Sequence, residues 1–247
     1  MEICEQSQAF VQQDGDLVFD HTKFILRQGG EYFFARSSKR FPKSSTVDVS
    51  LLRTEKIPVD KVWPPMEPRF TAAPDPLPPN SFVKSPSLLY FGDTPAALEP
   101  GIQVTAEVEA CEVLRQHPHP NIARYFGCVS EHGRIKGLCF VRYSMTLAQR
   151  LQDAASLDKA LCLQGIKNGV DHMHNLGLVH NDLNPSNIMM DGDTPVIIDF
   201  DSYQRIGEKL GRKSGTTGWT IKGSEYARLE NDEYSVAKIR ELLMEGR

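Results

Sequence analysis

The sequence predicts an α+β fold for a chain of 247 residues. Short β-branched and aromatic runs mark strands in the first half, and apolar residues at steps of three and four mark helices in the second half. Eleven of the 16 prolines lie between Pro58 and Pro100, where their fixed φ and missing donors exclude a continuous helix or a central strand. We expect an ordered strap or a loop in that region.

The composition is that of an ordinary soluble globular protein, with 40% hydrophobic residues and a net charge of -4. This charge provides no excess of Lys and Arg for a phosphate backbone, so we expect no nucleic-acid partner. No apolar run reaches the roughly 18 residues of a membrane span, and the N-terminus lacks signal-peptide features. The five scattered cysteines, without a CxxC pair, favour reduced thiols. We therefore expect an intracellular monomer, cytoplasmic or nuclear, without a membrane partner.

The residues before the prolines predict a small antiparallel sheet. The runs 17–19, 24–26 and 32–34 are β-prone, and turn residues at 27–31 separate the last two runs. Gly29 and Gly30 could instead belong to a phosphate-binding loop, but the chain contains no GxGxxG or GxxxxGK[ST] sequence. The turn is therefore the favoured interpretation.

The elements after the prolines alternate between strands and helices. Residues 81–84 predict a strand that carries Lys84, and Thr105 is expected to cap a helix that ends by Pro118. The remaining elements are expected in this order: strands at 122–128 and 137–143, a helix from Ser156 to Gly177, strands at 178–180 and 195–199, and a last helix from about Asn231.

One polar constellation carries the sharpest chemical signal. Residues 180–187 read His-Asn-Asp-Leu-Asn-Pro-Ser-Asn, and Asp199-Phe200-Asp201 follows. This pattern resembles the eukaryotic protein-kinase-like superfamily, whose catalytic loop is H-R-D-x-x-x-x-N and whose metal motif is D-F-G. The resemblance implies that Asp182 accepts the proton of a substrate hydroxyl and that Asn187 and Asp199 hold Mg²⁺. A polar turn could carry the same residue types, but the ordered motifs around the constellation favour the kinase-like interpretation.

Motifs on both sides extend the resemblance to about residues 80 to 245. His-Pro-Asn-Ile at 119–122 resembles the turn after helix C of protein kinases. By that register, Lys84 and Glu109 take the places of the paired lysine and glutamate that bind nucleotide, with Glu112 as a competitor. Residues 139–143 resemble the strand that leads into the hinge, so Val141 and Tyr143 are implied to contact the adenine of ATP. Two further matches are Gly-Thr-Thr-Gly-Trp at 215–219, similar to the end of the activation loop, and residues 231–235, similar to the start of helix F.

Four departures from the family pattern have physical consequences. Asn181 replaces the arginine that would bind a phosphorylated loop, so regulation through such a loop is not expected. Asn184 replaces the lysine of the family's catalytic loop. The replacement removes a positive charge near the γ-phosphate, which predicts weak activity. Asp201 replaces the glycine of D-F-G and is either an extra metal ligand or a loop carboxylate. The fourth departure is the missing glycine-rich loop.

The resemblance implies a bilobal protein-kinase-like fold. Residues 1–79 are expected to form a β-rich extension and the proline-rich strap, 80–143 a β-rich N-lobe, and 144–247 a mostly helical C-lobe, truncated after helix F. The implied function is ATP- and Mg²⁺-dependent phosphate transfer to Ser or Thr hydroxyls of a protein substrate.

Two other functions stay open. The first is a pseudokinase that acts as a binding or scaffolding module, because of Asn184, the missing loop and the short C-lobe. The second is a small-molecule kinase, because H-N-D-x-x-x-x-N with I-D-F-[DE] is also similar to choline and aminoglycoside kinases. Asn181 and Asp201 favour this last possibility, whereas the HPNI and GTTGW segments favour a protein kinase.

Overall fold

The chain divides into two units in the computed structural model, and each is described by itself. By its contacts, unit 1 comprises Met1–Pro65 and Pro86–Ile102, and unit 2 comprises Met66–Ser85 and Gln103–Arg247. The boundaries expected at residues 79/80 and 143/144 stay a prediction. Among the described residues, no helix has the length and apolar character of a membrane span. The structure describes residues 1–13, 15–42, 46–89, 91–93, 100–153, 155–211 and 215–245.

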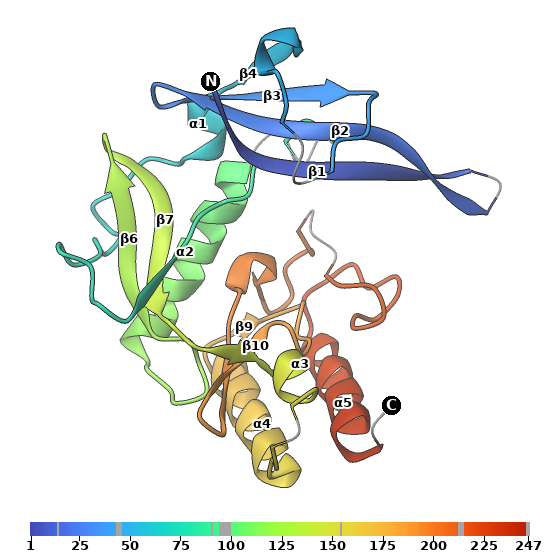
Figure 1. The fold of residues 1–247 in the computed structure, drawn as a ribbon. Helices are drawn as coiled ribbons and strands as arrows, with labels where there is room; N and C mark the ends of the chain where they lie inside the picture. Colours follow the sequence, from blue (N-terminus) through green and yellow to red (C-terminus); the bar gives the residue numbers. More distant parts are fainter. Residues whose placement is uncertain are drawn as a thin grey trace. The chain divides into compact units, whose positions relative to one another are not determined.

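Unit 1 is built on a four-stranded antiparallel sheet with the strand order β1-β2-β3-β4 (Figure 1). The predicted turn is confirmed, because Gln28 pairs with Glu31 across two glycines of positive φ. The runs 17–19 and 24–26 lie in one long strand, not in two. Sequence patterning missed the first and last strands, which are rich in charged and amide side chains. The strands are β1 (Glu2–Gln13), β2 (Asp16–Gln28), β3 (Glu31–Ser37) and β4 (Thr54–Ile57).

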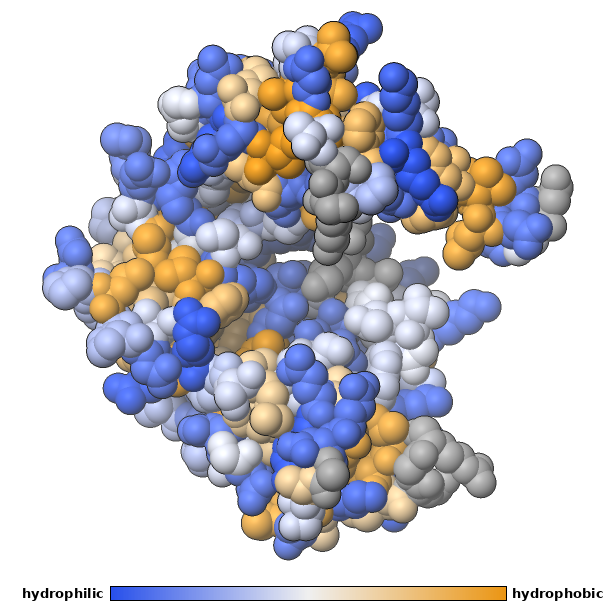
Figure 2. Space-filling view, viewed as in Figure 1, coloured by the Kyte–Doolittle hydropathy of each residue, from blue (hydrophilic) through white to orange (hydrophobic). Residues whose placement is uncertain are grey.

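Both faces of this sheet are covered, which is why three consecutive residues of β2, Phe24, Ile25 and Leu26, are fully buried. Ile25 packs with Trp63, which follows the short helix α1 (Val59–Val62), and with Leu88 and Phe91. Phe24 and Leu26 pack on the other face with residues around the 3₁₀ turn η1 (Val49–Leu51). The end of the β1–β2 ribbon is instead exposed and apolar, as Figure 2 shows, through Phe10, Val11, Leu17 and Val18.

Lys23, a buried lysine, ties part of the proline-rich region to the sheet. Its Nζ donates to the carbonyl of Phe91 and to Asp93 Oδ1, both at 2.6 Å. Burial lowers the pKa of Lys23, and the Asp93 carboxylate opposes that shift. Lys23 therefore anchors the segment around Phe91 and Asp93 to β2.

The first part of unit 2 is a three-stranded antiparallel sheet of order β5-β7-β6 and the helix α2 (Pro100–Gln116), which belongs to unit 2 from Gln103 onward. This helix begins one turn before the predicted cap Thr105, because Pro100 is suited to a first helical position. The strands are β5 (Ser81–Lys84), β6 (Tyr125–Glu131) and β7 (Arg134–Val141), so the two predicted at 122–128 and 137–143 start and end about three residues away from their predicted bounds.

Residues 71–73, in the first half of the proline-rich region, run along the outer edge of β6. Cys128 N donates to the carbonyl of Thr71 at 2.7 Å, and Ala73 N donates to the carbonyl of Cys128 at 2.8 Å. Gly127 permits this approach, because a Cβ atom there would lie 2.6 Å from the main chain of Ala72. The strap thus completes one edge of the sheet before the chain enters β5.

The rest of unit 2 is mostly helical, as predicted. The helix α4 (Lys159–Asn175) buries Leu163, Ile166, Val170 and Met173, the stripe read from the sequence. Its cap is Asp158 and not Ser156, because the Asp158 carboxylate accepts the Leu161 N–H at 2.9 Å. The other elements are β8 (Met145–Thr146), α3 (Leu147–Arg150), β9 (Leu178–Val179), β10 (Ile188–Asp191), β11 (Thr194–Ile197), η3 (Phe200–Ser202), β12 (Gln204–Arg205) and α5 (Leu229–Glu245).

A buried carboxylate in the first turn of α5 anchors the segment that follows β9. Asp232 accepts the main-chain N–H of His180 at 2.8 Å and that of Asn181 at 2.9 Å. His174, at the end of α4, contacts the same carboxylate through Nε2 at 2.9 Å. One side chain therefore joins two helices to residues 180–181.

We expect Gly127→Ala to lower the free energy of unfolding by about 2 to 4 kcal/mol, because main-chain atoms of the strap cannot move aside cheaply. The matched control is Gly133→Ala: Gly133 also has a positive φ, but its Cβ would meet no atom within 4 Å. This control is expected to cost about 1 kcal/mol. Urea unfolding of the three proteins checks the prediction, and equal losses in the two variants would contradict it.

Asp232→Ala removes the acceptor of two buried N–H groups, so we expect a loss of about 3 to 5 kcal/mol in the free energy of unfolding. Glu230→Ala, on the exposed side of the same helical turn, is the control and is expected to stay within about 0.5 kcal/mol of the wild type. Hydrogen exchange adds a local readout: the amides of His180 and Asn181 should exchange faster in the Asp232 variant. Unchanged protection of those amides would show that the anchor is misassigned.

Candidate active site

Three charged side chains from distant parts of unit 2 meet at one point. Lys84 Nζ, at the end of β5, lies 2.6 and 2.7 Å from the two carboxylate oxygens of Glu107 on α2. The same Nζ lies 2.5 Å from Oδ1 of Asp199, which follows β11. The side chain of Glu107 is 5% exposed and that of Lys84 30%, so the cluster is largely shielded from water.

The pairing predicted for Glu109 is wrong, because the partner of Lys84 is Glu107. Residues two apart on a helix point about 200° away from each other, so both glutamates cannot face the same lysine. Glu109 instead contacts Arg69 at 2.8 Å, and the competitor Glu112 accepts the N–H and hydroxyl of Thr71. A sequence signal existed: Glu107, Cys111 and Leu114 share a spacing of four and three, which puts Glu107 on the buried face of the helix.

The charges within this cluster shift one another's pKa. Burial lowers the pKa of Lys84, but the negative charges of Glu107, Asp199 and Asp201 outweigh it and hold that pKa well above its ordinary value. Burial raises the pKa of Glu107, and the ammonium of Lys84 opposes that shift. Lys84 therefore keeps its positive charge throughout the physiological pH range.

A pocket of about 390 Å³ opens beside the cluster. Val141 and Tyr143 both line it, as do the three charged residues of the cluster. The chain that leaves β7 here is held by main-chain bonds, in which Val141 N donates to the Arg124 carbonyl at 3.0 Å and Arg142 N to the Asn80 carbonyl at 3.1 Å. The other lining residues are mostly apolar: Phe82, Ala123, Phe140, Met189 and Ile198, together with Arg142.

The carboxylate of Asp182 is buried in a loop that is rich in amide side chains. Its Oδ1 accepts the main-chain N–H of Thr216 at 2.7 Å. Asn187 Nδ2 donates to the Asp182 carbonyl at 2.8 Å and lies 3.4 Å from its Oδ2. The structure thus brings Asp182 and Asn187 together, as the motif spacing predicts, although sequence analysis did not identify the contact with Thr216.

Asn184 has structural contacts in place of the charge that a lysine would bring. Its Nδ2 donates to the Asp182 carbonyl at 3.1 Å and lies 3.3 Å from the hydroxyl of Thr216. Its Oδ1 accepts the N–H of Ser186 at 2.9 Å. These bonds hold the loop and Thr216 together without adding positive charge.

Asn181 similarly joins three segments through neutral hydrogen bonds. Its Nδ2 donates to the carbonyls of Val179 and Ser202, at 3.1 and 3.3 Å, and its Oδ1 accepts from Asn231 Nδ2 at 2.9 Å. An arginine at this position would need a phosphate or carboxylate partner, whereas the asparagine is satisfied by its neighbours. The chain after Ser202 is therefore attached to the loop without a phosphate.

Two residues of the motifs have left-handed backbone conformations. Asn181 has a φ of 62° and Asp199 a φ of 66°. Non-glycine residues adopt this region at a cost, and such residues concentrate at functional sites. The hydrogen bonds and ion pairs described above hold Asn181 and Asp199 in this conformation. The backbone strain therefore lies in the two segments that carry the Asp182 and Asp199 carboxylates.

Asp201 has a contact within its own loop and an electrostatic effect on Lys84. Its Oδ1 accepts the hydroxyl of Ser202 at 3.1 Å, and its charge raises the pKa of Lys84. Within the described parts of the chain, no group of three or more His, Cys, Asp or Glu residues could hold a metal ion. A role of Asp201 as an extra metal ligand thus stays a prediction.

Comparison with known proteins identifies a family that matches this chain. Residues 96–237, more than half of the chain, match the protein kinase domain. The serine/threonine-protein kinase/endoribonuclease IRE1 of Hypocrea jecorina is 31% identical over 122 residues, which are 41% of this chain and 10% of that protein. Mitogen-activated protein kinase kinase kinase 3 of Arabidopsis thaliana is 26% identical over 122 residues, 48% of this chain and 18% of the relative.

The mouse sperm motility kinase 2B is 32% identical over 111 residues, 42% of this chain and 23% of that kinase. The chain thus spans less than a quarter of the length of these relatives. A solved structure, the yeast RNA Pol II CTD kinase CTDK-1 complex, contains a chain that superposes with a TM-score of 0.51 at 18% identity, over 59% of this chain and 51% of that chain. It supports the fold alone. The family match, together with the Lys84 cluster and the Asp182 loop, shows that this α+β chain belongs to the protein kinase family.

Proposed function

We propose that this kinase-family chain transfers the γ-phosphate of Mg²⁺-bound ATP to Ser or Thr hydroxyls of a protein. The observation that carries the proposal is the cluster of Lys84, Glu107 and Asp199 at one wall of an apolar pocket. A fixed ammonium group beside a carboxylate suits the binding of phosphate and metal, and apolar walls suit an adenine ring. Val141 and Tyr143 would contact that ring.

The donor set of the site fits magnesium. Asp199 offers carboxylate oxygens and Asn187 an amide oxygen, and Mg²⁺ prefers oxygen ligands of this kind. When bound, the metal would neutralise the charge that the phosphates develop during transfer. Lys84 would bind the phosphates, and Glu107 would keep its ammonium group in place.

Asp182 would orient the acceptor hydroxyl and take its proton at Oδ2. The other oxygen, Oδ1, accepts the Thr216 N–H, which fixes the plane of the carboxylate. Asn187 holds the main chain of Asp182 through its carbonyl. The chain's residues thus act by positioning, which is the main requirement of phosphoryl transfer.

A second candidate function, a pseudokinase that binds nucleotide without efficient transfer, is favoured by one specific feature. Asn184 supplies neutral hydrogen bonds where a lysine would bring positive charge to the transferred phosphate. Loss of one such charge commonly costs about 3 kcal/mol at the transition state. The two candidates share the same nucleotide site and differ in turnover.

With Mg²⁺ and ATP, we expect Asp182→Asn to lower the rate of ADP formation about 100-fold or more, because the amide cannot accept the hydroxyl proton. The asparagine keeps the size of the side chain and an acceptor for Thr216, so the fold should survive. Coupled-enzyme detection of ADP with a generic protein substrate measures the effect. A rate unchanged by the substitution would exclude Asp182 as the base.

A thermal-shift titration with Mg²⁺-ATP separates the two candidates. Binding at 100 times the dissociation constant adds about 2.7 kcal/mol to the stability of the folded protein, so the wild type should melt at a higher temperature. Lys84→Met should abolish the shift. A shift without turnover identifies a pseudokinase, and the absence of a shift at millimolar nucleotide would exclude a nucleotide site.

Asn184→Lys should raise turnover about 10-fold or more, since it restores a positive charge near the transferred phosphate. The control is Asn184→Met, which fills similar space without a charge and loses the same hydrogen bonds to Ser186 and Asp182. Steady-state kinetics on the three proteins checks the prediction. Equal rates in the lysine and methionine variants would show that the missing charge does not limit the reaction.

A further inference from the structure

Two histidine rings of unit 2 stack on each other outside the Lys84 cluster. His119 lies in the turn after α2 and His172 lies on α4, with ring centroids 4.7 Å apart and ring planes inclined by 21°. Nε2 of His172 lies 2.7 Å from the main-chain carbonyl of His117, and it carries a hydrogen because a carbonyl oxygen only accepts. His172 can therefore take a second proton at Nδ1 without losing this bond.

His119, in contrast, is held in its neutral form by the main chain of its own turn. The N–H of Asn121 donates to Nδ1 of His119 at 3.2 Å. Nδ1 has to be unprotonated to accept this bond, so the hydrogen of the neutral ring is on Nε2. A proton added at Nδ1 would remove the acceptor of the Asn121 N–H and place two N–H groups against each other. The folded turn therefore opposes protonation of His119.

The groove beside His119 offers no negative charge that would stabilise a protonated ring. Arg115 and Arg124 line it, and no carboxylate of the described residues does. Glu112, the last acidic residue of α2, contacts Arg115 at 3.4 Å. The exposed His117, two positions before His119, is a further base. These neighbours therefore favour the neutral form of His119.

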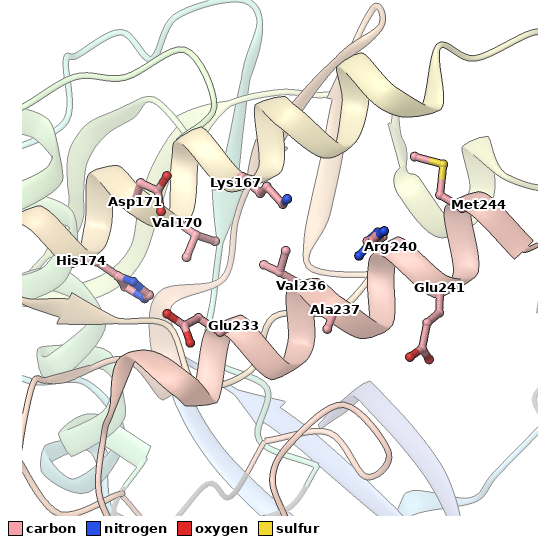
Figure 3. Close-up of a pocket in the computed structure, with 10 residues that line it drawn as sticks. All are labelled: Lys167, Val170, Asp171, His174, Glu233, Val236, Ala237, Arg240, Glu241 and Met244. Atoms are coloured by element: carbon pink, nitrogen blue, oxygen red, sulfur yellow. The ribbon is translucent and has the colours of Figure 1, made fainter.

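On the side of α4, the group that acts on His119 is His172. The other titratable residues of α4 within five positions of His172 are Lys167, Asp171 and His174. All three line a separate groove between α4 and α5, where Figure 3 shows them. Burial and the charge that His172 can carry both lower the pKa of His119, with burial as the larger cause.

The turn that contains His119 is bonded to β11 and thereby supports the segment after it. Asn121 Nδ2 donates to the carbonyl of Pro195 at 2.8 Å, and this side chain is buried. The main-chain carbonyl of Asn121 accepts the N–H of Ile197 at 2.9 Å. Asp199 follows Ile197 by two residues. A change in the position of Asn121 is therefore transmitted to the strand that leads to the Asp199 carboxylate.

We propose that the stacked pair of His119 and His172 is a pH-sensitive contact that positions the Asp199 segment. When His119 is neutral, its Nδ1 holds Asn121 and the turn stays bonded to β11. Protonation of His119 releases the Asn121 N–H and places a positive charge against His172, which loosens the turn. Because the pKa of His119 in the folded chain lies below its ordinary value of about 6.5, the stabilisation is complete above pH 6.5 and is lost as the pH falls through the folded value.

His119→Asn separates the hydrogen-bond acceptor from the charge. Asparagine Oδ1 can occupy the position of Nδ1 and accept the Asn121 N–H, but it takes no proton. Amide exchange of the full chain at pH 7.5 and 5.0, expressed as protection factors, measures the effect. In the wild type, the protection of Asn121 and Ile197 should fall about fivefold at pH 5.0, as expected for the loss of one hydrogen bond, whereas in His119→Asn it should not change. Equal protection at both pH values in the wild type would overturn the proposal.

His132→Asn is the matched control, because the His132 side chain is 90% exposed and its φ of 50° suits asparagine. This variant should lose protection of the two amides as the wild type does, and an abolished pH effect would show that His119 is not the responsible group. His172→Gln keeps a donor for the His117 carbonyl but removes the second charge. It should reduce the fivefold loss to about half, and a loss as large as in the wild type would exclude His172 from the contact.

A thermal-shift titration with Mg²⁺-ATP tests whether the contact affects the site, a step that rests on the function proposed above. The apparent dissociation constant of the wild type should rise about fivefold or more between pH 7.5 and 5.0, and that of His119→Asn should rise less. An equal rise in both proteins would show that the contact does not position Asp199. A wild type that binds no nucleotide at pH 7.5 would contradict the proposed function, and the amide exchange would still decide whether the contact is pH-sensitive.

Discussion

The ammonium group of Lys84 links three segments of unit 2. Lys84 arrives from a sheet, Glu107 from a helix and Asp199 from the segment after β11, and all three meet within hydrogen-bond distance. Without the lysine, two carboxylates would remain close together and partly shielded from water, which is strongly unfavourable. The positions of β5, α2 and the segment after β11 within unit 2 are therefore interdependent, and the cluster forms part of the wall of the pocket.

The two asparagines that depart from the family pattern preserve the shape of the loop but not its positive charge. Asn181 and Asn184 stand where arginine and lysine are usual, and their amides bond to the main chain and side chains around them. Together with the Asp232 carboxylate, which holds two main-chain N–H groups, they keep the loop in a strained left-handed conformation. The loop thus retains its shape while it loses two positive charges. In the proposed phosphotransfer, such a site would exert a weaker field on the transferred phosphate.

Contacts within each unit explain how the proline-rich region is ordered. Prolines prevent that region from forming regular structure, yet its described parts are ordered by specific contacts: Lys23 binds the carbonyl of Phe91, and Thr71 and Ala73 pair with Cys128. A strap of this kind needs main-chain partners, because a sequence with so few donors cannot satisfy itself. The composition predicted that the region is irregular, and the partners were visible only in the structure.

Local sequence determined the α+β class, the turn at Gly29 and Gly30 and the buried stripe of α4, because these depend on periodicity and turn chemistry. Short motifs also predicted Asp182, Asn187 and Asp199 as candidate site residues, whose roles stay a prediction. The partner of Lys84 was decided by tertiary structure. Helix α2 begins at Pro100 and buries Glu107, and a two-residue difference in register turns Glu109 to the opposite side, toward Arg69. Thr216 and Asp232 also depend on long-range contacts. The sequence around Thr216 and Asp232 does not distinguish them from other threonines and aspartates of the chain. Each acquires its role only when distant segments pack together.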